Sequence, residues 1–156
     1  MTIIERASSQ DFAHICALDE TVHAGSPRRR FIGEACANGR VAVARVDAVV
    51  RGFIIADESF FEQFFVRLLI VHPDFRRRGL GRALMRAAEL DCQTGKLFTS
   101  TNQSNLAMQR LCDRLGFVKC GYIENLDAGD PELIYVKFLA PVPSAPPIDT
   151  GDDGAG

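Results

Sequence analysis

Three consecutive arginines and two glycines stand between an apolar run and an amphipathic segment, a combination that can bind an anion. The arginines are residues 76–78, and the glycines are Gly79 and Gly81. Glycine lets an anion approach the backbone, and arginine donates charge-assisted hydrogen bonds. The free N–H groups of a helix's first turn add the positive end of the helix dipole. We therefore expect a pyrophosphate-like anion at this point of the chain.

The flanking residues predict a strand before this loop and a helix after it. Residues 64–71 are apolar except for Arg67 and rich in aromatic and β-branched types, which favours a strand buried on both faces. Pro73 ends it, because proline cannot donate to a sheet. The following apolar residues recur at helical spacing: Leu80, Ala83, Leu84, Ala87 and Leu90.

The glycine pattern narrows the kind of anion. The chain has no G-x-x-x-x-G-K-[ST] sequence, so the phosphate loop of nucleotide triphosphatases is absent. The dinucleotide-binding pattern G-x-G-x-x-G is also incomplete, because its third glycine would be at position 84, which is leucine. Arg76, Gly79 and Gly81 form an R-x-x-G-x-G pattern. It resembles the pyrophosphate-binding motif of the GNAT superfamily of acyl-CoA-dependent N-acetyltransferases. The alternative is a basic helix start that only faces water.

Composition limits the function classes. The chain has 156 residues, with 47% hydrophobic and 24% charged, typical of one soluble globular domain. Leaving out three aspartates near the C-terminus, the chain has 17 acidic and 18 basic residues. This nearly neutral balance predicts no nucleic-acid partner. No apolar run approaches the roughly 20 residues of a membrane span. Five cysteines without C-x-x-C spacing predict reduced thiols, a cytoplasmic location and no metal site.

The pattern of turns and apolar residues predicts an α/β fold with a mixed sheet. We expect one domain over residues 1–139 and a disordered tail, rich in Pro, Gly and Asp, over 140–156. The expected strands are 2–6, 40–46, 49–56, 64–71, 96–101, 117–124 and 133–139. The expected helices start at Ser8 or Ser9, at Ser26-Pro27, at Leu80 and at 102–104, and residues 57–63 are expected to form a turn. A strand, a crossover helix and a strand imply a parallel pair at the centre.

A second motif strengthens the resemblance. Residues 105–117, NLAMQRLCDRLGF, look like the family's N-x-x-[AM]-x-x-L-Y-x-x-x-G-F helix, except that Cys112 stands at the tyrosine. The element order β-α-α-β-β-β-α-β-α-β-β also matches the GNAT fold, over about residues 2–139. The resemblance implies an N-acetyltransferase that uses acetyl-CoA as cosubstrate.

The resemblance also implies a cofactor site. Backbone groups of Ile70 and Val71 would pair with the pantetheine arm, and the amide of Val71 would meet the thioester carbonyl oxygen. Asn105 either reaches the pantetheine or only caps its helix. The pyrophosphate would be wrapped by the amides from Arg76 to Gly81, with Arg82 a candidate for the 3′-phosphate; this segment comprises Arg76, Arg77, Arg78, Gly79, Leu80 and Gly81.

The proton-transfer groups are weakly marked. Cys112 lies on the apolar stripe of its helix, so we expect it to face the core or line the cofactor rather than act in catalysis. Tyr122 is the candidate replacement acid. Some members carry a glutamate where Ser100 stands here. Glu62 is the candidate base, with Glu58, Asp19 and Glu20 as alternatives.

Three functions stay open at this point. The first is acetylation of a primary amine on a small molecule, favoured by acidic turns at 57–62 and 127–132. The second is acetylation of a protein N-terminus or lysine, and the third is a non-catalytic acyl-CoA-binding regulator. A homodimer is possible in each case.

Overall fold

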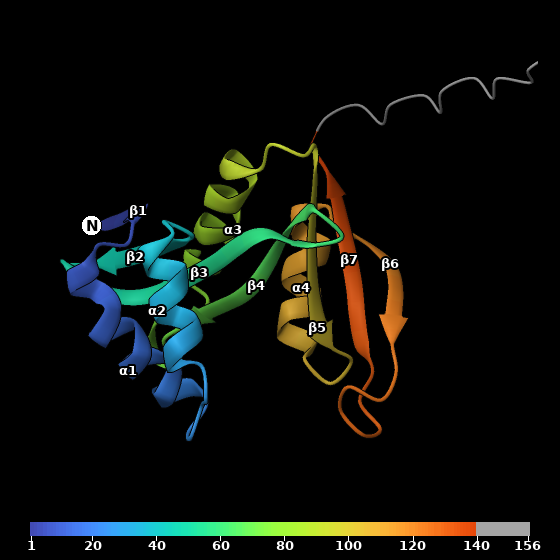
Figure 1. Cartoon of the computed structure of the whole chain (residues 1–156), viewed down its shortest axis with the longest axis horizontal. Helices are drawn as coiled ribbons and strands as arrows, with labels where there is room; N and C mark the ends of the chain where they lie inside the picture. Colours follow the sequence, from blue (N-terminus) through green and yellow to red (C-terminus); the bar gives the residue numbers. More distant parts are fainter. Residues whose placement is uncertain (140–156) are drawn as a thin grey trace, which may run out of the picture.

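A seven-stranded mixed sheet forms the body of the protein, with strand order β1-β2-β3-β4-β5-β7-β6 (Figure 1). The computed structural model describes residues 1–139, and the predicted tail at 140–156 lies outside them. The strands are β1 Thr2–Arg6, β2 Val41–Val46, β3 Val49–Phe60, β4 Gln63–Val71, β5 Lys96–Asn102, β6 Val118–Ile123 and β7 Glu132–Phe138. The helices are α1 Phe12–Val22, α2 Arg29–Ala37, α3 Leu80–Asp91 and α4 Leu106–Leu115. Fold class and element order are confirmed.

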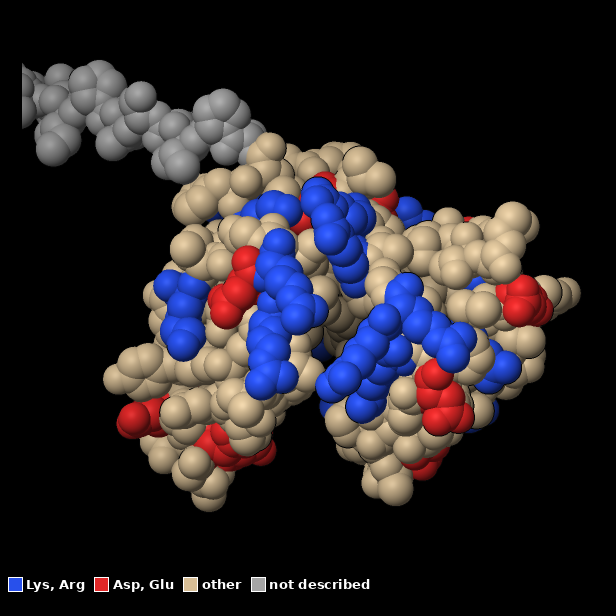
Figure 2. Space-filling view, turned by 180° about the vertical axis from the view of Figure 1, so that it is seen from behind, with Lys and Arg blue, Asp and Glu red and all other residues tan. Residues whose placement is uncertain are grey.

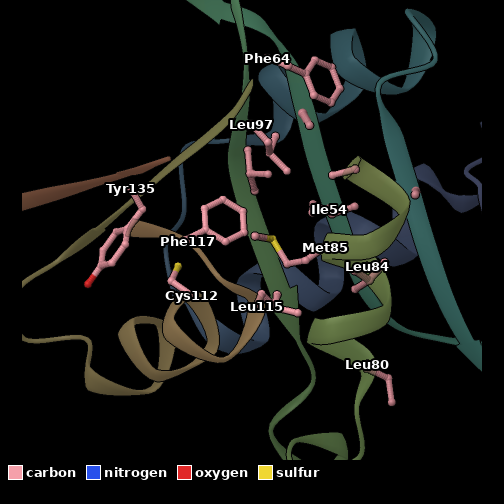
Figure 3. Packing of buried hydrophobic residues seen from close by; sticks show 14 of the residues in the cluster. Ile54, Phe64, Leu80, Leu84, Met85, Leu97, Cys112, Leu115, Phe117 and Tyr135 are labelled. Carbon is pink, nitrogen blue, oxygen red and sulfur yellow. The ribbon is translucent and has the colours of Figure 1, made fainter. Parts of the chain in front are cut away.

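The two faces of the sheet carry separate hydrophobic cores. One core joins α1 and α2 to the sheet, with Ile15, Ile32 and Phe53 at its centre. The other joins α3 and α4 to the opposite face and includes Leu84 and Cys112 (Figure 3). The division leaves α3 and α4 together on one face, next to the central strands.

The parallel pair β4–β5 is the point where the sheet opens. Only three residue pairs join these strands, Phe64 with Leu97, Phe65 with Phe98 and Val66 with Thr99. Beyond Val66, β4 diverges from β5. Its pairing with β3 also shifts register here, because Ile55 pairs with Leu68 and Ala56 with Val66, which leaves Arg67 as a bulge. The second half of β4 therefore has a neighbouring strand on one side only.

Two predicted boundaries in the first half were wrong. The expected turn at 57–63 is mostly strand, because β3 continues to Phe60 and only Phe61 and Glu62 turn, both in the left-handed region (φ 50° and 65°). The second helix does not start at Ser26-Pro27 but at Arg29. The Ser26 hydroxyl bonds the buried carboxylate of Asp19 instead of capping the helix.

Two details in the second half also differ from expectation. Residue Asn102 ends β5, opposite Glu132, and α4 starts only at Leu106. Leu90 is 87% exposed rather than part of the apolar stripe of α3, because it lies about 200° around the helix from buried Ala88. Within residues 1–139, no helix is both long and apolar enough to span a membrane.

Candidate active site

The backbone of β4 presents unpaired groups to the opening between β4 and β5. The His72 N–H donates to the carbonyl of Arg51 at 2.7 Å, so the residues of β4 alternate from there between bonding β3 and facing away. Ile70 lies opposite Phe53 in a bonded pair, whereas Val71 and Leu69 point their N–H and C=O groups into the opening. The prediction for Val71 agrees with this geometry. Strand alternation turns the backbone groups of Ile70, the predicted second contact, toward β3, so we place that contact at Leu69 instead.

The loop after β4 turns the chain sharply into α3. Residues Pro73–Phe75 form one 3-10 turn, and Arg77 and Gly79 both adopt left-handed backbone (φ 61° and 81°). Gly79 occupies the N-cap position of α3. Because glycine has no side chain, the first N–H groups of α3 are left without a capping side chain. The Arg76 Nε donates to the carbonyl of Val71 at 3.4 Å, which ties the loop to the end of β4.

Within residues 1–139, acidic side chains do not neutralise the charges around this loop. Among the residues that the structure describes, none of the ion pairs includes any of six exposed arginines on the loop, α3 and α4. They are Arg76, Arg77, Arg78, Arg82, Arg110 and Arg114. Figure 2 shows this face with Lys and Arg side chains gathered around a cleft. An unpaired cluster of this kind attracts a multiply charged anion.

Two further residues shape the loop, and sequence reasoning missed both. Gly52 of β3 lies opposite Val71, where a Cβ would come within 3.1 Å of both the Ile70 carbonyl oxygen and Leu84 Cδ1. A glycine inside the strand-like run VVRGFII is the signal that could have found it. The guanidinium of Arg51 lies 4.4 Å from the centre of the Phe75 ring, which Arg78 also approaches at 4.9 Å.

The N-terminus of α4 closes the other side of the opening. The Asn105 side chain accepts a hydrogen bond from the N–H of Met108 at 3.1 Å, so its capping role is present. Leu111 of the same helix faces α3, since a Cβ on Gly81 would lie 3.4 Å from Leu111 Cδ2 and 3.9 Å from Val71 Cγ2. Gly81 therefore stands where α3, α4 and β4 come together.

The comparisons with known proteins agree with this arrangement. The chain matches the family model of the acetyltransferase (GNAT) domain over residues 37–119. The chain belongs to the GNAT family. It is 36% identical to a GNAT-family acetyltransferase from Bacillus cereus, with a TM-score of 0.85, covering 88% of this chain and 97% of that one. No curated protein sequence matches it.

More distant GNAT structures share the fold. The ribosomal-protein-S18-alanine N-acetyltransferase of Escherichia coli is 19% identical, with a TM-score of 0.76, covering 92% of this chain and 97% of that one. The acetyltransferase yncA of Salmonella typhimurium, solved with acetyl-CoA, is 20% identical with a TM-score of 0.74, covering 94% and 98%.

The protein is thus an acetyl-CoA-dependent acetyltransferase, and its residues fit that cosubstrate. The N–H groups of Leu69 and Val71 and the carbonyl of Leu69 can pair with an amide-rich arm, and the arginines of the loop can hold phosphates. When bound, acetyl-CoA supplies the activated acetyl thioester.

Cys112, at the GNAT tyrosine position, is fully buried in the α3/α4 core. Burial, with a smaller effect from Asp113, raises the pKa of the thiol to about 12. It is therefore protonated at neutral pH and packs as a small apolar group, as expected from its helical stripe.

The structure does not bring Glu62 or Tyr122 to Val71. Glu62 is at the β3–β4 hairpin tip, nine residues and roughly 30 Å of extended strand from Val71. Tyr122 lies on the edge strand β6, with β7 and β5 between it and β4, and it is 65% exposed. It lines a shallow cavity of about 540 Å³ beside the first turn of α4. Neither residue enters the mechanism proposed below.

Proposed function

We propose that this GNAT enzyme acetylates a primary amine of a small, cationic molecule. The observation that carries this proposal is the charge of the β6–β7 loop. Asn102 Nδ2 donates to Asp127 at 2.8 Å, and the N–H and hydroxyl of Ser104 donate to Asp130 at 3.0 and 2.6 Å. These donors are neutral, so they fix the two carboxylates in place and leave their negative charge available.

In the acidic turn at 57–62, ion pairs neutralise two of the three carboxylates, and only Glu62 at the hairpin tip is in none. Asp57 forms an ion pair with Arg67 at 3.2 Å, and Glu58 pairs with Arg40 at 2.9 Å. By contrast, no ion pair within residues 1–139 includes Asp127 or Asp130. The acidic loop lies beside the C-terminal end of β5, since Asn102 pairs with Glu132, at the end of the sheet where β4 and β5 part (Figure 1). A cationic amine would be concentrated at this end of the opening.

In the proposed mechanism, the backbone holds and polarises the thioester. The N–H of Val71 donates to the carbonyl oxygen, on which negative charge develops as the amine attacks. Leu69 bonds the pantetheine arm, and Asn105 contributes its side chain from α4. The amides and arginines between Arg76 and Arg82 hold the phosphates, which positions the reacting carbon for direct attack.

The acceptor class can be tested by measuring the rate of thiol release from acetyl-CoA with polyamines, aminoglycosides, amino acids and peptides as candidate acceptors. We expect turnover with a cationic small amine. The double variant Asp127→Asn, Asp130→Asn should raise KM for that amine and leave KM for acetyl-CoA unchanged, with the effect shrinking at high salt. Preference for peptides over every small amine would contradict the proposal.

The matched control is Asp47→Asn in the β2–β3 turn. Asp47 is an exposed carboxylate that pairs only with the N-terminal ammonium group at 3.0 Å, and asparagine tolerates its left-handed backbone (φ 49°). This variant also removes a negative charge, so it should leave both KM values unchanged. An equal rise of KM in the control would mean that overall charge, and not the β6–β7 loop, attracts the amine.

A further inference from the structure

Arg67 and Ser100 stand at the point where β4 and β5 part, one on each strand. They are the first residues after the three residue pairs that join these strands. The Arg67 side chain lies on the α1/α2 face of the sheet, because its guanidinium is 4.2 Å from the centre of the Phe31 ring of α2. Ser100 lies on the same face, since Leu97 belongs to the α3/α4 core and alternate residues of a strand point to opposite faces.

This face is the side of the opening that the cosubstrate leaves free. The loop after β4 leads into α3, which packs on the opposite face of the sheet together with α4. The arginines of the loop and of these two helices border the cleft on that opposite side (Figure 2). Acetyl-CoA held by them approaches the opening from the α3/α4 side, so an acceptor reaches the thioester from the α1/α2 side, past Arg67 and Ser100.

The guanidinium of Arg67 is held in place and still has donors to offer. Among the hydrogen bonds within residues 1–139, one involves this side chain, from Nη1 to the Asp57 carboxylate at 3.2 Å. A guanidinium has five N–H groups, so four are left for a ligand, and the side chain is 41% exposed. Arg67 is also a bulge residue, and bulges beside active sites turn a side chain toward the site. A planar group with adjacent free N–H donors matches a carboxylate.

From Ser100, the same face of β5 leads to the acidic β6–β7 loop. Asn102 is two residues further along the strand, about 7 Å from Ser100. Its Nδ2 donates to the carboxylate of Asp127 at 2.8 Å. A free guanidinium edge and a fixed carboxylate therefore stand at the two ends of one short path. The side chain of lysine or ornithine can bridge such a path, with its carboxylate at one end and its side-chain ammonium at the other.

We propose that the acceptor is a basic α-amino acid, acetylated on its α-amine, and that Arg67 selects it by binding its carboxylate. The α-amine is one carbon from that carboxylate and so lies at the opening, while the side-chain ammonium lies at the acidic loop. The neutral α-amine nitrogen forms a bond to the thioester carbon, and the carbon–sulfur bond breaks with its electron pair going to sulfur. The proton that the nitrogen loses ends on sulfur, which gives the Nα-acetyl amino acid and CoA. The inference rests on the proposed function, whose acceptor class it narrows.

The first test compares L-lysine with L-lysinamide and cadaverine, which keep its amines but lack the carboxylate. We expect kcat/KM for lysine to be at least about tenfold higher than for the other two, although charge alone would favour them, and mass spectrometry to find the acetyl group on the α-nitrogen.

Equal turnover of cadaverine, or acetyl on the side-chain nitrogen, would overturn the role of Arg67 and leave a small cationic acceptor standing. Turnover of peptides with no small amine accepted would overturn this inference and the proposed function together.

The second test is Arg67→Gln, with Arg40→Gln as the matched control. Arg40 is similarly exposed and pairs with Glu58, the residue after Asp57, at 2.9 Å. Arg67→Gln should raise KM for lysine roughly 10- to 100-fold without raising KM for cadaverine or acetyl-CoA, and Arg40→Gln should change none of the three. Arg67→Lys should restore only part of the loss, because an ammonium group cannot bond both carboxylate oxygens side by side.

An unchanged KM for lysine in Arg67→Gln would overturn the inference. An equal rise of KM for lysine and cadaverine would do the same, since Arg67 would then support the structure and not select a carboxylate.

Discussion

The loop after β4 and the core under α4 are built in opposite ways. We assign recognition in the loop to main-chain groups, to left-handed Gly79 and to arginines that form no ion pair within residues 1–139. Under α4, by contrast, side chains such as Cys112 and Tyr135 are packed in the core, both almost fully buried (Figure 3). Main-chain recognition constrains the backbone and leaves most side chains free. A packed core instead constrains the size of its side chains.

The largest expected effect concerns the loop. Gly81→Asp should abolish CoA binding, because its side chain would enter the junction of α3, α4 and β4 and add a negative charge to the phosphate site. Calorimetry with CoA measures this. Gly121→Asp on β6 is the control, because a Cβ there has no neighbour within 4 Å. Wild-type affinity in a folded Gly81→Asp variant would refute main-chain recognition at this loop.

Single arginines should matter less than the backbone. Replacing Arg76, Arg77, Arg78 or Arg82 by alanine should weaken CoA binding by roughly 1.5–3 kcal/mol for each arginine that bonds a phosphate. Arg30→Ala is the control, since Arg30 is exposed on α2 and pairs with Glu34. Measuring 3′-dephospho-CoA as well identifies the arginine that binds the 3′-phosphate. Its alanine variant should lose affinity for CoA but bind 3′-dephospho-CoA as the wild type does. Equal affinities for all variants would show that charge plays no part.

Under α4, changes of size should cost stability rather than rate. Cys112→Tyr should lower the free energy of unfolding by about 1–3 kcal/mol through overpacking against Tyr135, with no gain in turnover. Cys112→Ala and Cys112→Ser should keep most activity. Melting curves and turnover for all three separate the effects. A collapse of activity in Cys112→Ala at unchanged stability would mean that the thiol acts in catalysis.

The smallest effect is a pH dependence of stability. The pKa of Cys112 is raised to about 12 by burial, against an ordinary value of 9.0 in the unfolded chain. The thiol therefore stabilises the fold fully below pH 9, and this contribution disappears as pH rises toward 12. Denaturant unfolding from pH 8 to 10.5 should show a decline that is shallower in Cys112→Ala. Identical slopes would contradict the buried-thiol interpretation.

Sequence patterns predicted the loop after β4 better than they predicted the packing under α4. Periodicity and the R-x-x-G-x-G pattern are local, so they located β4, the loop and α3 and, through the family resemblance, Val71. The shift from Ile70 to Leu69 comes from the phase of strand alternation, which is set by pairing with β3 and which no local pattern reveals. Tyr135 lies in an apolar strand, ELIYVKF, and only the packing of β7 against α4 gives it a neighbour such as Cys112.

Amide hydrogen exchange, resolved by residue with and without CoA, tests main-chain recognition most directly. In the free protein the Ile70 N–H bonds β3, whereas the N–H groups of Leu69 and Val71 face the opening. We predict that CoA strongly slows exchange at Leu69 and Val71 and changes it little at Ile70, which is protected already. Protection gained at Ile70 alone, or at none of the three while CoA is bound, would contradict the account.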